Sequence, residues 1–183
     1  KIESGKMTLN PEIISLRETM ESIVSIILPQ TRTKKQKFEI SISDILVEGV
    51  YCDSVRLNQV LINFLSNAYK FTPEGGEILF SLNQEESPKG YRYVRVHFRV
   101  KDSGIGMPPE FQKKIFESFS REDNARVNKT EGSGLGMTIS KYIVDAMEGT
   151  IELKSEVNKG TEFHVTIDME KAAGKEADME LPG

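Results

Sequence analysis

The chain has 183 residues, which fits a single domain, and 38% of them are hydrophobic, enough to form one core. A formal net charge of −4 disfavours nucleic acid as a partner, because phosphate backbones are bound by a concentrated basic surface. No apolar run approaches the roughly 20 residues that cross a bilayer, and the single cysteine, Cys52, favours a reducing compartment. We therefore expect a cytoplasmic location without direct membrane contact.

The N-terminal part of the chain is expected to be helical. Residues 1–6 resemble the end of a helix that begins outside this sequence. Ser15 and Glu18 form a capping-box pattern, Ser-x-x-Glu, which is typical of a helix start. Apolar residues then recur at helical spacing, and Pro29 should kink or shorten this helix.

A strand and a second long helix follow. Residues 38–43 alternate apolar and polar side chains, as in a strand with one buried face. Asp53 can cap the next helix, whose apolar stripe continues to the Thr-Pro-Glu-Gly-Gly stretch at 72–76. That stretch ends the helix.

The second half of the chain contains further strands. They are expected at residues 77–83, 91–102, 150–155 and 160–169, and a polar hairpin at 84–90 joins the first two. Apolar residues occupy one face of the later strands, and charged residues and histidines occupy the other. Such alternation is typical of a sheet with one face exposed to water.

Two helices and a long polar segment lie between these strands. Pro108 and Pro109 open a short helix that ends at Ile115, and a longer helix spans about 135–147. Residues 118–134 are polar and have no periodic pattern, and a segment of this kind inside a compact domain is usually functional. Helices that alternate with strands in this way predict a two-layer α/β (α+β) sandwich.

Three sparse motifs occur in one order along this pattern. Asn63 and Asn67 are four residues apart in the second long helix and so project from the same face. The stretch Asp-Ser-Gly-Ile-Gly at 102–106 places a carboxylate at a strand end, directly before two glycines. A second glycine motif, Gly-Ser-Gly-Leu-Gly at 132–136, lies at the start of a helix. Each motif is common alone, but their combination is far more specific.

Each motif has an ordinary structural interpretation beside a functional one. The asparagines can be two surface amides, or they can ligate Mg²⁺, which prefers hard oxygen ligands, with Lys70 placed one turn beyond Asn67 to meet a phosphate. Asp102 can be a turn residue, or it can accept a hydrogen bond from an exocyclic amine of a ligand that the glycines allow to approach. The glycines at 132–136 can cap a helix, or they can cradle a phosphate on backbone N–H groups.

Taken together, the motifs resemble those of the ATP-binding catalytic domain of sensor histidine kinases, in the GHKL ATPase and kinase superfamily. The resemblance covers residues 8–169 and implies a mixed, mostly antiparallel sheet of about five strands with about three helices on one face. It also implies that residues 1–7 are the end of a dimerisation helix or a linker, and that residues 170–183 are a disordered tail or linker. The matching segments are the N box at 57–73, the glycine boxes at 102–106 and 132–137, and the F box at 116–119.

The resemblance implies ATP and Mg²⁺ as ligands and gives roles to individual residues. Asp102 would bind the adenine amino group, Asn67 would hold Mg²⁺, and Lys70 would contact a phosphate. Arg121, with Arg126 as a second candidate, would neutralise the γ-phosphate from the long polar segment, which would form an ATP lid. The other implied ATP-binding residues are Gly104, Gly106, Ile115, Phe116, Gly132, Ser133, Gly134, Leu135 and Gly136.

The residue at position 63 bears on the reaction. ATP-hydrolysing members of the superfamily have a glutamate there that activates water, whereas the amide of Asn63 cannot act as a general base. The resemblance therefore implies a site that binds Mg-ATP but hydrolyses it poorly. Its catalytic residues, Asn63, Lys70 and Arg121, would hold the γ-phosphoryl group for another nucleophile.

The phosphoacceptor is expected outside this sequence. A histidine kinase phosphorylates an exposed helical histidine, whereas His97 and His164 both lie in predicted strands on the polar face. The implied partners are a His-bearing dimerisation domain of the parent protein and a downstream response-regulator receiver domain. The chain would be cytoplasmic, alone or as the cytoplasmic part of a membrane-anchored receptor.

Two alternatives stay open at this point. The chain could be a nucleotide-binding module whose lid regulates a partner without phosphoryl transfer. It could also be a gyrase- or chaperone-type ATPase, against which Asn63 argues. Phosphoryl transfer to a purified dimerisation domain would exclude the first alternative, and substantial Mg-dependent ATP turnover would favour the second.

Overall fold

A computed structural model describes residues 2–3, 6–115 and 133–172. Its centre is a five-stranded sheet in the order β4-β6-β7-β9-β8. β4 and β6 are parallel and the other neighbouring pairs are antiparallel, so the sheet is mixed and mostly antiparallel, as predicted. The strands are β4 (Lys37–Ser43), β6 (Glu77–Glu86), β7 (Tyr93–Asp102), β8 (Thr150–Glu156) and β9 (Gly160–Glu170).

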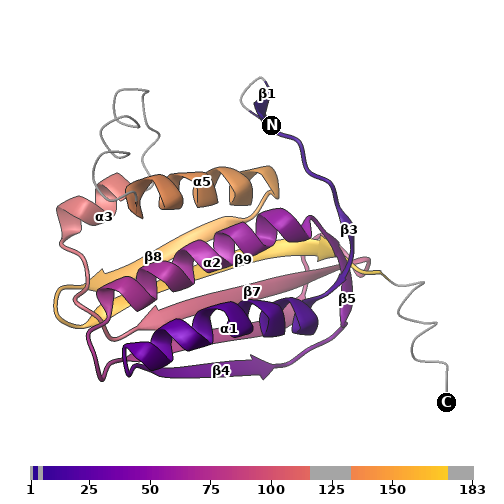
Figure 1. Cartoon of the computed structure of the whole chain (residues 1–183). Coiled ribbons are helices and arrows are strands. Elements are labelled where there is room, and N and C mark those ends of the chain that lie inside the picture. Colours follow the sequence, from indigo (N-terminus) through magenta and orange to yellow (C-terminus); the bar gives the residue numbers. More distant parts are fainter. Residues whose placement is uncertain (1, 4–5, 116–132, 173–183) are drawn as a thin grey trace, which may run out of the picture.

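The helices cover one face of this sheet, which confirms the two-layer arrangement (Figure 1). They are α1 (Leu16–Thr33), α2 (Ser54–Phe71), α3 (Pro109–Ile115) and α5 (Ser133–Ala146). Both predicted caps are present, because the Ser15 hydroxyl accepts from the Glu18 N–H and the Asp53 carboxylate accepts from the Arg56 N–H, each at 3.2 Å. Pro29 does not end α1, which continues beyond it. No helix in the described ranges is both long enough and apolar enough to cross a membrane.

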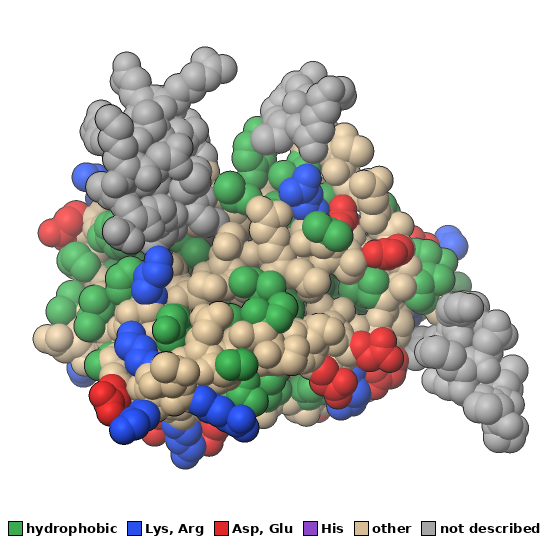
Figure 2. Space-filling model, viewed as in Figure 1, with side chains coloured by type: hydrophobic (Ala, Val, Ile, Leu, Met, Phe, Trp, Pro, Cys, Tyr) green, Lys and Arg blue, Asp and Glu red, His purple; other side chains and the backbone are tan. Residues whose placement is uncertain are grey.

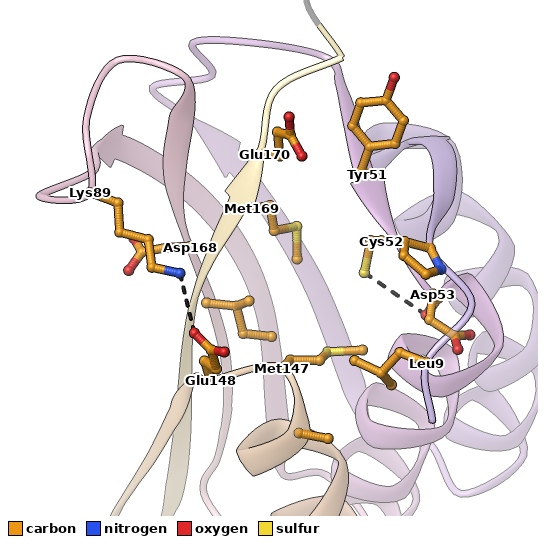
Figure 3. A pocket seen from close by; sticks show the side chains of 13 residues that line it. Leu9, Tyr51, Cys52, Asp53, Lys89, Met147, Glu148, Asp168, Met169 and Glu170 are labelled. Carbon is orange, nitrogen blue, oxygen red and sulfur yellow. Dashed lines mark hydrogen bonds and ion pairs between the residues drawn. The ribbon is translucent and has the colours of Figure 1, made fainter. Parts of the chain in front are cut away.

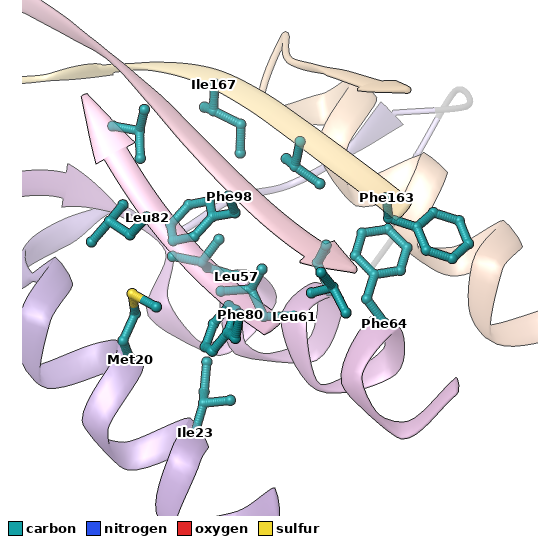
Figure 4. Close-up of a cluster of buried hydrophobic side chains, with 14 of the residues drawn as sticks. Met20, Ile23, Leu57, Leu61, Phe64, Phe80, Leu82, Phe98, Phe163 and Ile167 are labelled. Atoms are coloured by element: carbon teal, nitrogen blue, oxygen red, sulfur yellow. The ribbon is translucent and has the colours of Figure 1, made fainter. Parts of the chain in front are cut away.

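The core lies between the helices and the sheet (Figure 4). Apolar side chains of α1 and α2 meet those of β6, β7 and β9 there, and Phe80 and Phe98 are fully buried. Phe64 of α2 stacks on Phe163 of β9, with ring centroids 4.5 Å apart and ring planes 8° apart. Because Asn67 follows Phe64 by one helical turn, this stack also fixes the position of Asn67 relative to the sheet.

The opposite face of the sheet carries paired polar side chains, as the alternating strands predict. Glu85, His97, His164 and Glu152 form a row across it, with contacts of 2.7, 2.8 and 3.0 Å between successive side chains. Both ring nitrogens of each histidine are therefore in hydrogen-bonding contact. Burial and the nearby guanidinium of Arg99 lower the pKa of His164, against the hydrogen bond to Glu152.

The start of the chain differs from the expected helix end. Ile2–Glu3 (β1) and Lys6–Met7 (β2) form a short antiparallel pair. The sequence between them is Ser-Gly, which favours a turn over a helix. A second small sheet, which the sequence did not predict, pairs β3 (Glu12–Ser15) with β5 (Gly49–Cys52).

The folded unit also extends past residue 169, the predicted C-terminal limit. The Ala172 N–H donates to the Gly49 carbonyl at 3.1 Å, and Lys171 bridges to Val50. Ala172 is 1% exposed. The end of β9 therefore packs against β5, and residues 170–172 belong to the folded unit.

Candidate functional site

A cavity of about 210 Å³ opens where the C-terminal end of α2 meets the end of β7. The loop after β7 and the helix α3 form further walls, and the first residues of β9 complete the lining. Its polar side chains are Asn67, Asp102 and Thr161. A mostly apolar cavity with a few convergent polar groups is the usual form of a small-ligand site. The other lining residues are Phe71, Ile105, Gly106, Met107, Pro108, Phe111, Ile115 and Phe163.

Asp102 is the last residue of β7 and is 9% exposed. Its Oδ1 accepts a hydrogen bond from the Gly104 N–H at 2.8 Å. Burial raises the pKa of Asp102, and hydrogen bonds from the backbone N–H groups of Gly104 and Thr161 oppose that shift. A carboxylate can accept about four hydrogen bonds, so Asp102 can also bind an N–H donor of a flat ligand.

The glycines that follow Asp102 are required by the packing of the chain on itself. A Cβ atom on Gly104 would collide with the carbonyl of Phe71 at the end of α2. Gly106 has a φ of +73°, and a Cβ atom there would collide with the carbonyl of Glu156. Gly106 lines the cavity and Gly104 does not. The interpretation that both glycines admit a ligand is therefore incomplete, since they also admit neighbouring backbone.

Asn67 projects from α2 into the cavity wall. It is 9% exposed, and within the described part of the chain its side chain makes no hydrogen bond. Its amide oxygen is therefore available, and it fits Mg²⁺, which takes hard oxygen ligands and keeps several waters. Lys70, one turn beyond, is exposed and lies outside the cavity lining.

Asn63, one turn before Asn67, is also absent from the cavity lining. Its Nδ2 donates to the hydroxyl of Ser140 at 3.1 Å. Asn63 thus joins α2 to α5, the helix that begins within the second glycine motif.

Part of the predicted site lies outside the residues that the structure describes. The second glycine motif enters α5 at its second residue, so its backbone is helical from there. α3, whose last residue Ile115 lines the cavity, lies against α5. The predicted site residues outside the described part are Phe116, Arg121, Arg126 and Gly132, together with the side chains of Ser133, Gly134, Leu135 and Gly136.

Several cavity residues were missed by the sequence analysis. Thr161 pairs with Asp102 across β9 and β7. It lies two residues before Phe163, so strand alternation could have placed it on the same inward face. Met107 and Phe111 carry no such signal, because their positions depend on how the loop after β7 folds.

Basic side chains gather at the same end of the molecule, at the left in Figure 2. Lys34 Nζ donates to the carbonyls of Tyr69 and Lys70 at 3.0 and 3.1 Å, and so caps the C-terminal end of α2. Lys35, in the turn after α1, and Lys37, the first residue of β4, are exposed and pair with Glu74 and Glu39 at 3.9 and 3.3 Å. The paired glutamates offset part of this positive charge.

A second cavity, of about 350 Å³, lies at the other end of the sheet, between β5, the end of β9 and the turn after α5 (Figure 3). Lys89 and Glu148 pair with each other on its rim at 3.4 Å. Burial raises the pKa of Cys52 to about 12, so this thiol is protonated and unreactive at neutral pH. The part of the chain that the structure describes holds no metal-binding cluster of three or more His, Cys, Asp or Glu side chains. The first cavity is therefore the better candidate for chemistry.

A mixed sheet with helices on one face and a mostly apolar cavity lined by a buried carboxylate defines a two-layer α/β sandwich with a small-ligand site. The family model for histidine kinase-, DNA gyrase B- and HSP90-like ATPases matches residues 52–171. The chain belongs to this family.

Relatives and solved structures agree with this family. The autoinducer 2 sensor kinase/phosphatase LuxQ of Vibrio vulnificus strain YJ016 is 36% identical over 177 residues, which cover 96% of this chain and 20% of LuxQ. The chain spans about a fifth of the length of the curated relatives it matches. The nucleotide-free catalytic domain of the histidine kinase ThkA has a TM-score of 0.68 and 28% identity, covering 87% of this chain and 95% of that domain. Full-length ShkA, solved in complex with AMPPNP, has a TM-score of 0.73 and 28% identity, over 91% of this chain and 32% of ShkA. The fold is thus that of a histidine-kinase catalytic domain.

Proposed function

We propose that this chain is the ATP-binding catalytic domain of a two-component sensor histidine kinase. It binds Mg-ATP and transfers the γ-phosphoryl group to a histidine on a dimerisation domain of the parent protein. One observation carries the proposal: the buried carboxylate of Asp102 lines a mostly apolar cavity whose wall also includes Asn67.

The proposed roles of Asp102 and Asn67 are supported by this arrangement, and those of Lys70, Arg121 and Arg126 by the match to the family. The adenine ring enters the cavity and its amino group donates to Asp102. The amide oxygen of Asn67 holds Mg²⁺, which supplies charge neutralisation to the phosphates when bound. Lys70, exposed beyond Asn67, contacts a phosphate outside the cavity. Arg121, with Arg126 as a second candidate, neutralises the γ-phosphate.

Phosphoryl transfer of this kind depends on positioning and charge neutralisation more than on covalent chemistry. Backbone N–H groups at the start of α5 favour a phosphate, because they are unpaired in the helix and carry its positive dipole end. Asn63 has no basic group, and its side chain bonds Ser140. Water is therefore not activated there, and the γ-phosphoryl group is kept for the acceptor histidine.

The acceptor lies on another domain. His97 and His164 are held in the hydrogen-bonded row on the polar face, away from the helices that line the cavity. A receiver domain then takes the phosphoryl group from the acceptor histidine. The chain works in the cytoplasm, alone or as the cytoplasmic part of a membrane-anchored receptor.

A transfer assay tests the proposal. The chain is mixed with γ-labelled Mg-ATP and a purified His-bearing dimerisation domain from the parent protein. Label should appear on the dimerisation domain, and replacing its acceptor histidine with Gln should abolish it. ATP binding without any transfer would indicate a regulatory nucleotide-binding module instead, and rapid Mg-dependent release of phosphate by the chain alone would indicate an ATPase.

A further inference from the structure

The row of polar side chains on the face of the sheet opposite the helices joins four strands. Glu85 lies in β6, His97 in β7, His164 in β9 and Glu152 in β8. The side chains of His97 and His164 are only 12% and 17% exposed, so water has limited access to their ring nitrogens. The hydrogens of the contacts in this row must therefore come mainly from the row itself.

Three contacts link the four side chains, and each contact needs one hydrogen. The atoms in contact are Glu85 Oε2 and His97 Nε2 at 2.7 Å, His97 Nδ1 and His164 Nε2 at 2.8 Å, and His164 Nδ1 and Glu152 Oε1 at 3.0 Å. Ionised carboxylates bring no hydrogen, and two neutral imidazoles bring one each. Two hydrogens cannot satisfy three contacts, whichever tautomers the histidines adopt.

The hydroxyl of Thr166 does not remove this deficit. Its Oγ1 lies 3.3 Å from both His97 Nδ1 and His164 Nε2, and its one hydrogen can serve only one of these nitrogens. If the outer nitrogens donate to the glutamates, the two inner nitrogens still direct lone pairs at each other across 2.8 Å. One additional proton between them turns this repulsion into a hydrogen bond.

The additional proton belongs on a ring, because an imidazole is more basic than a carboxylate. Burial and the guanidinium of Arg99 lower the pKa of His164, against the hydrogen bond to Glu152. His97 is therefore the better carrier of the charge, and its Nε2 faces the carboxylate of Glu85.

The other cations of this face have acidic neighbours of their own. Arg95 pairs with Asp168 at 2.9 Å, and the Arg95 hydrogen bond lowers the pKa of that carboxyl. Arg99 lies 3.6 Å from Glu162, whose register partner in β8 is Lys154. Glu85 and Glu152 thus have the histidine pair between them, and one positive charge there balances part of their negative charge.

We propose that this row is a proton-binding site, which at neutral pH holds one proton more than two neutral histidines carry and thereby links β6, β7, β9 and β8. His97 is then an imidazolium that donates to Glu85 and to His164, and neutral His164 donates from Nδ1 to Glu152. A further proton would place two N–H groups against each other in the 2.8 Å contact, so the row excludes it. The site lies away from the nucleotide cavity and does not depend on the proposed function.

This site makes the stability of the domain depend on pH in both directions. An unperturbed histidine titrates near 6.5, so in the unfolded chain the pair holds two protons in acid, one on average at pH 6.5 and none in alkali. The folded row holds one across this range. Below pH 6.5 the unfolded state binds more protons, so stability rises with pH; above pH 6.5 the folded state binds more, so stability falls.

Glu85→Gln tests the deficit of one hydrogen. The amide keeps the size of the side chain and can donate to His97 Nε2, so two neutral histidines then satisfy all three contacts. The additional proton should be lost, and with it the fall in stability above pH 6.5. Glu86→Gln, the same change at the next and also exposed residue, is the matched control and should keep that fall.

Urea unfolding with EDTA present measures the unfolding constant of each chain. From about pH 6.5 to 8 this constant should rise about tenfold or more in the unsubstituted chain relative to Glu85→Gln, since the two folded states differ by one bound proton. Glu86→Gln should behave like the unsubstituted chain. The same pH dependence in Glu85→Gln and in the unsubstituted chain would overturn the inference.

Histidine ¹⁵N NMR of the unsubstituted chain near pH 7 counts the hydrogens directly, and it decides the matter even if Glu85→Gln does not fold. Three of the four ring nitrogens of His97 and His164 should be protonated, and the bare one should be His164 Nε2. Two protonated nitrogens would show that no additional proton is held, and four would show that a second is not excluded. Either result overturns the inference.

Discussion

At the scale of single residues, Asp102 is a carboxylate that burial destabilises in its ionised form but that can accept a strong hydrogen bond from a ligand. Burial disfavours its ionised form, and two backbone N–H groups partly offset that cost. A carboxylate in such surroundings interacts strongly with a ligand N–H, because water does not compete for it. Two predictions follow from this residue, one for ligand affinity and one for the stability of the free domain.

Asp102→Asn should weaken ATP binding about 10- to 100-fold, because a charge-assisted hydrogen bond to the adenine amino group is lost and the new amide is partly a donor. Calorimetric titration with Mg-ATP measures this. Asp145→Asn, the same chemical change on the exposed side of α5, is the matched control and should leave affinity unchanged. Equal affinities for Asp102→Asn and the unsubstituted chain would disprove the role of Asp102.

The same substitution should not destabilise the nucleotide-free domain at neutral pH. The folded pKa of Asp102 is raised, so its contribution to stability is fully present below the unfolded pKa of 3.8 and is lost as the pH rises through the raised value. At pH 7 the ionised Asp102 therefore opposes folding, and Asn removes that charge. We expect the Tm of Asp102→Asn to equal or exceed that of the unsubstituted chain at pH 7. Near pH 4 the difference in Tm should change in favour of the unsubstituted chain. A large loss of Tm at pH 7 alone would contradict this.

Asn67→Ala should remove most of the dependence of ATP affinity on Mg²⁺, because the only protein ligand that we propose for the ion is lost. Affinity is measured with Mg²⁺ and with EDTA. Asn83→Ala, which removes an amide that bonds Arg99 on the opposite face, should keep the full metal effect. If Mg²⁺ still strengthens binding in Asn67→Ala, the ion is held elsewhere.

Sequence reasoning found Asp102 and Asn67 because each stands in a motif with fixed local spacing. It missed Thr161 because the place of this residue beside Asp102 depends on strand register. Asp102 and Thr161 are far apart in sequence and meet only when β7 and β9 pair. Their chemistry is set by tertiary hydrogen bonds that no local pattern reports.

At the scale of secondary structure, the long elements were predictable and the short ones were not. β6, β7 and β9 have ten or eleven residues, over which alternation is unmistakable. β3 and β5 have four each, too few for a period of two to be distinguished from chance. Both depend on partners distant in sequence, including the end of β9.

The end of β9 should therefore contribute measurably to stability. Ala172→Asp puts a charge at a position that is 1% exposed, beside Gly49. We expect a loss of about 2 kcal/mol or more and a fall in Tm of roughly 5–10 °C. Glu170→Ala, at an exposed position two residues earlier, is the control and should change Tm little. An unaltered Tm for Ala172→Asp would show that the folded unit ends before residue 172.

At the scale of the whole molecule, the two faces of the sheet differ. The cavity lies on the helix-covered face, whereas polar side chains on the other face form hydrogen bonds with one another. Incubated alone with γ-labelled Mg-ATP, the chain should retain no covalent phosphate, because its two histidines are engaged through both ring nitrogens. Intact-mass measurement detects any transfer. A phosphorylated species that disappears in His97→Gln or His164→Gln would contradict the prediction that neither histidine accepts phosphate.

The contact between Phe71 and the loop after β7 has a consequence for ligand selection. The Ile105 N–H donates to the Phe71 carbonyl at 3.2 Å, and Gly104 packs against the same carbonyl, so the last turn of α2 is joined to the residues beside Asp102 without any nucleotide. The distance between the Asp102 carboxylate and the amide oxygen of Asn67 is consequently set by the fold. A molecule whose base and phosphates are spaced differently from those of a nucleoside triphosphate can contact one of these two groups but not both.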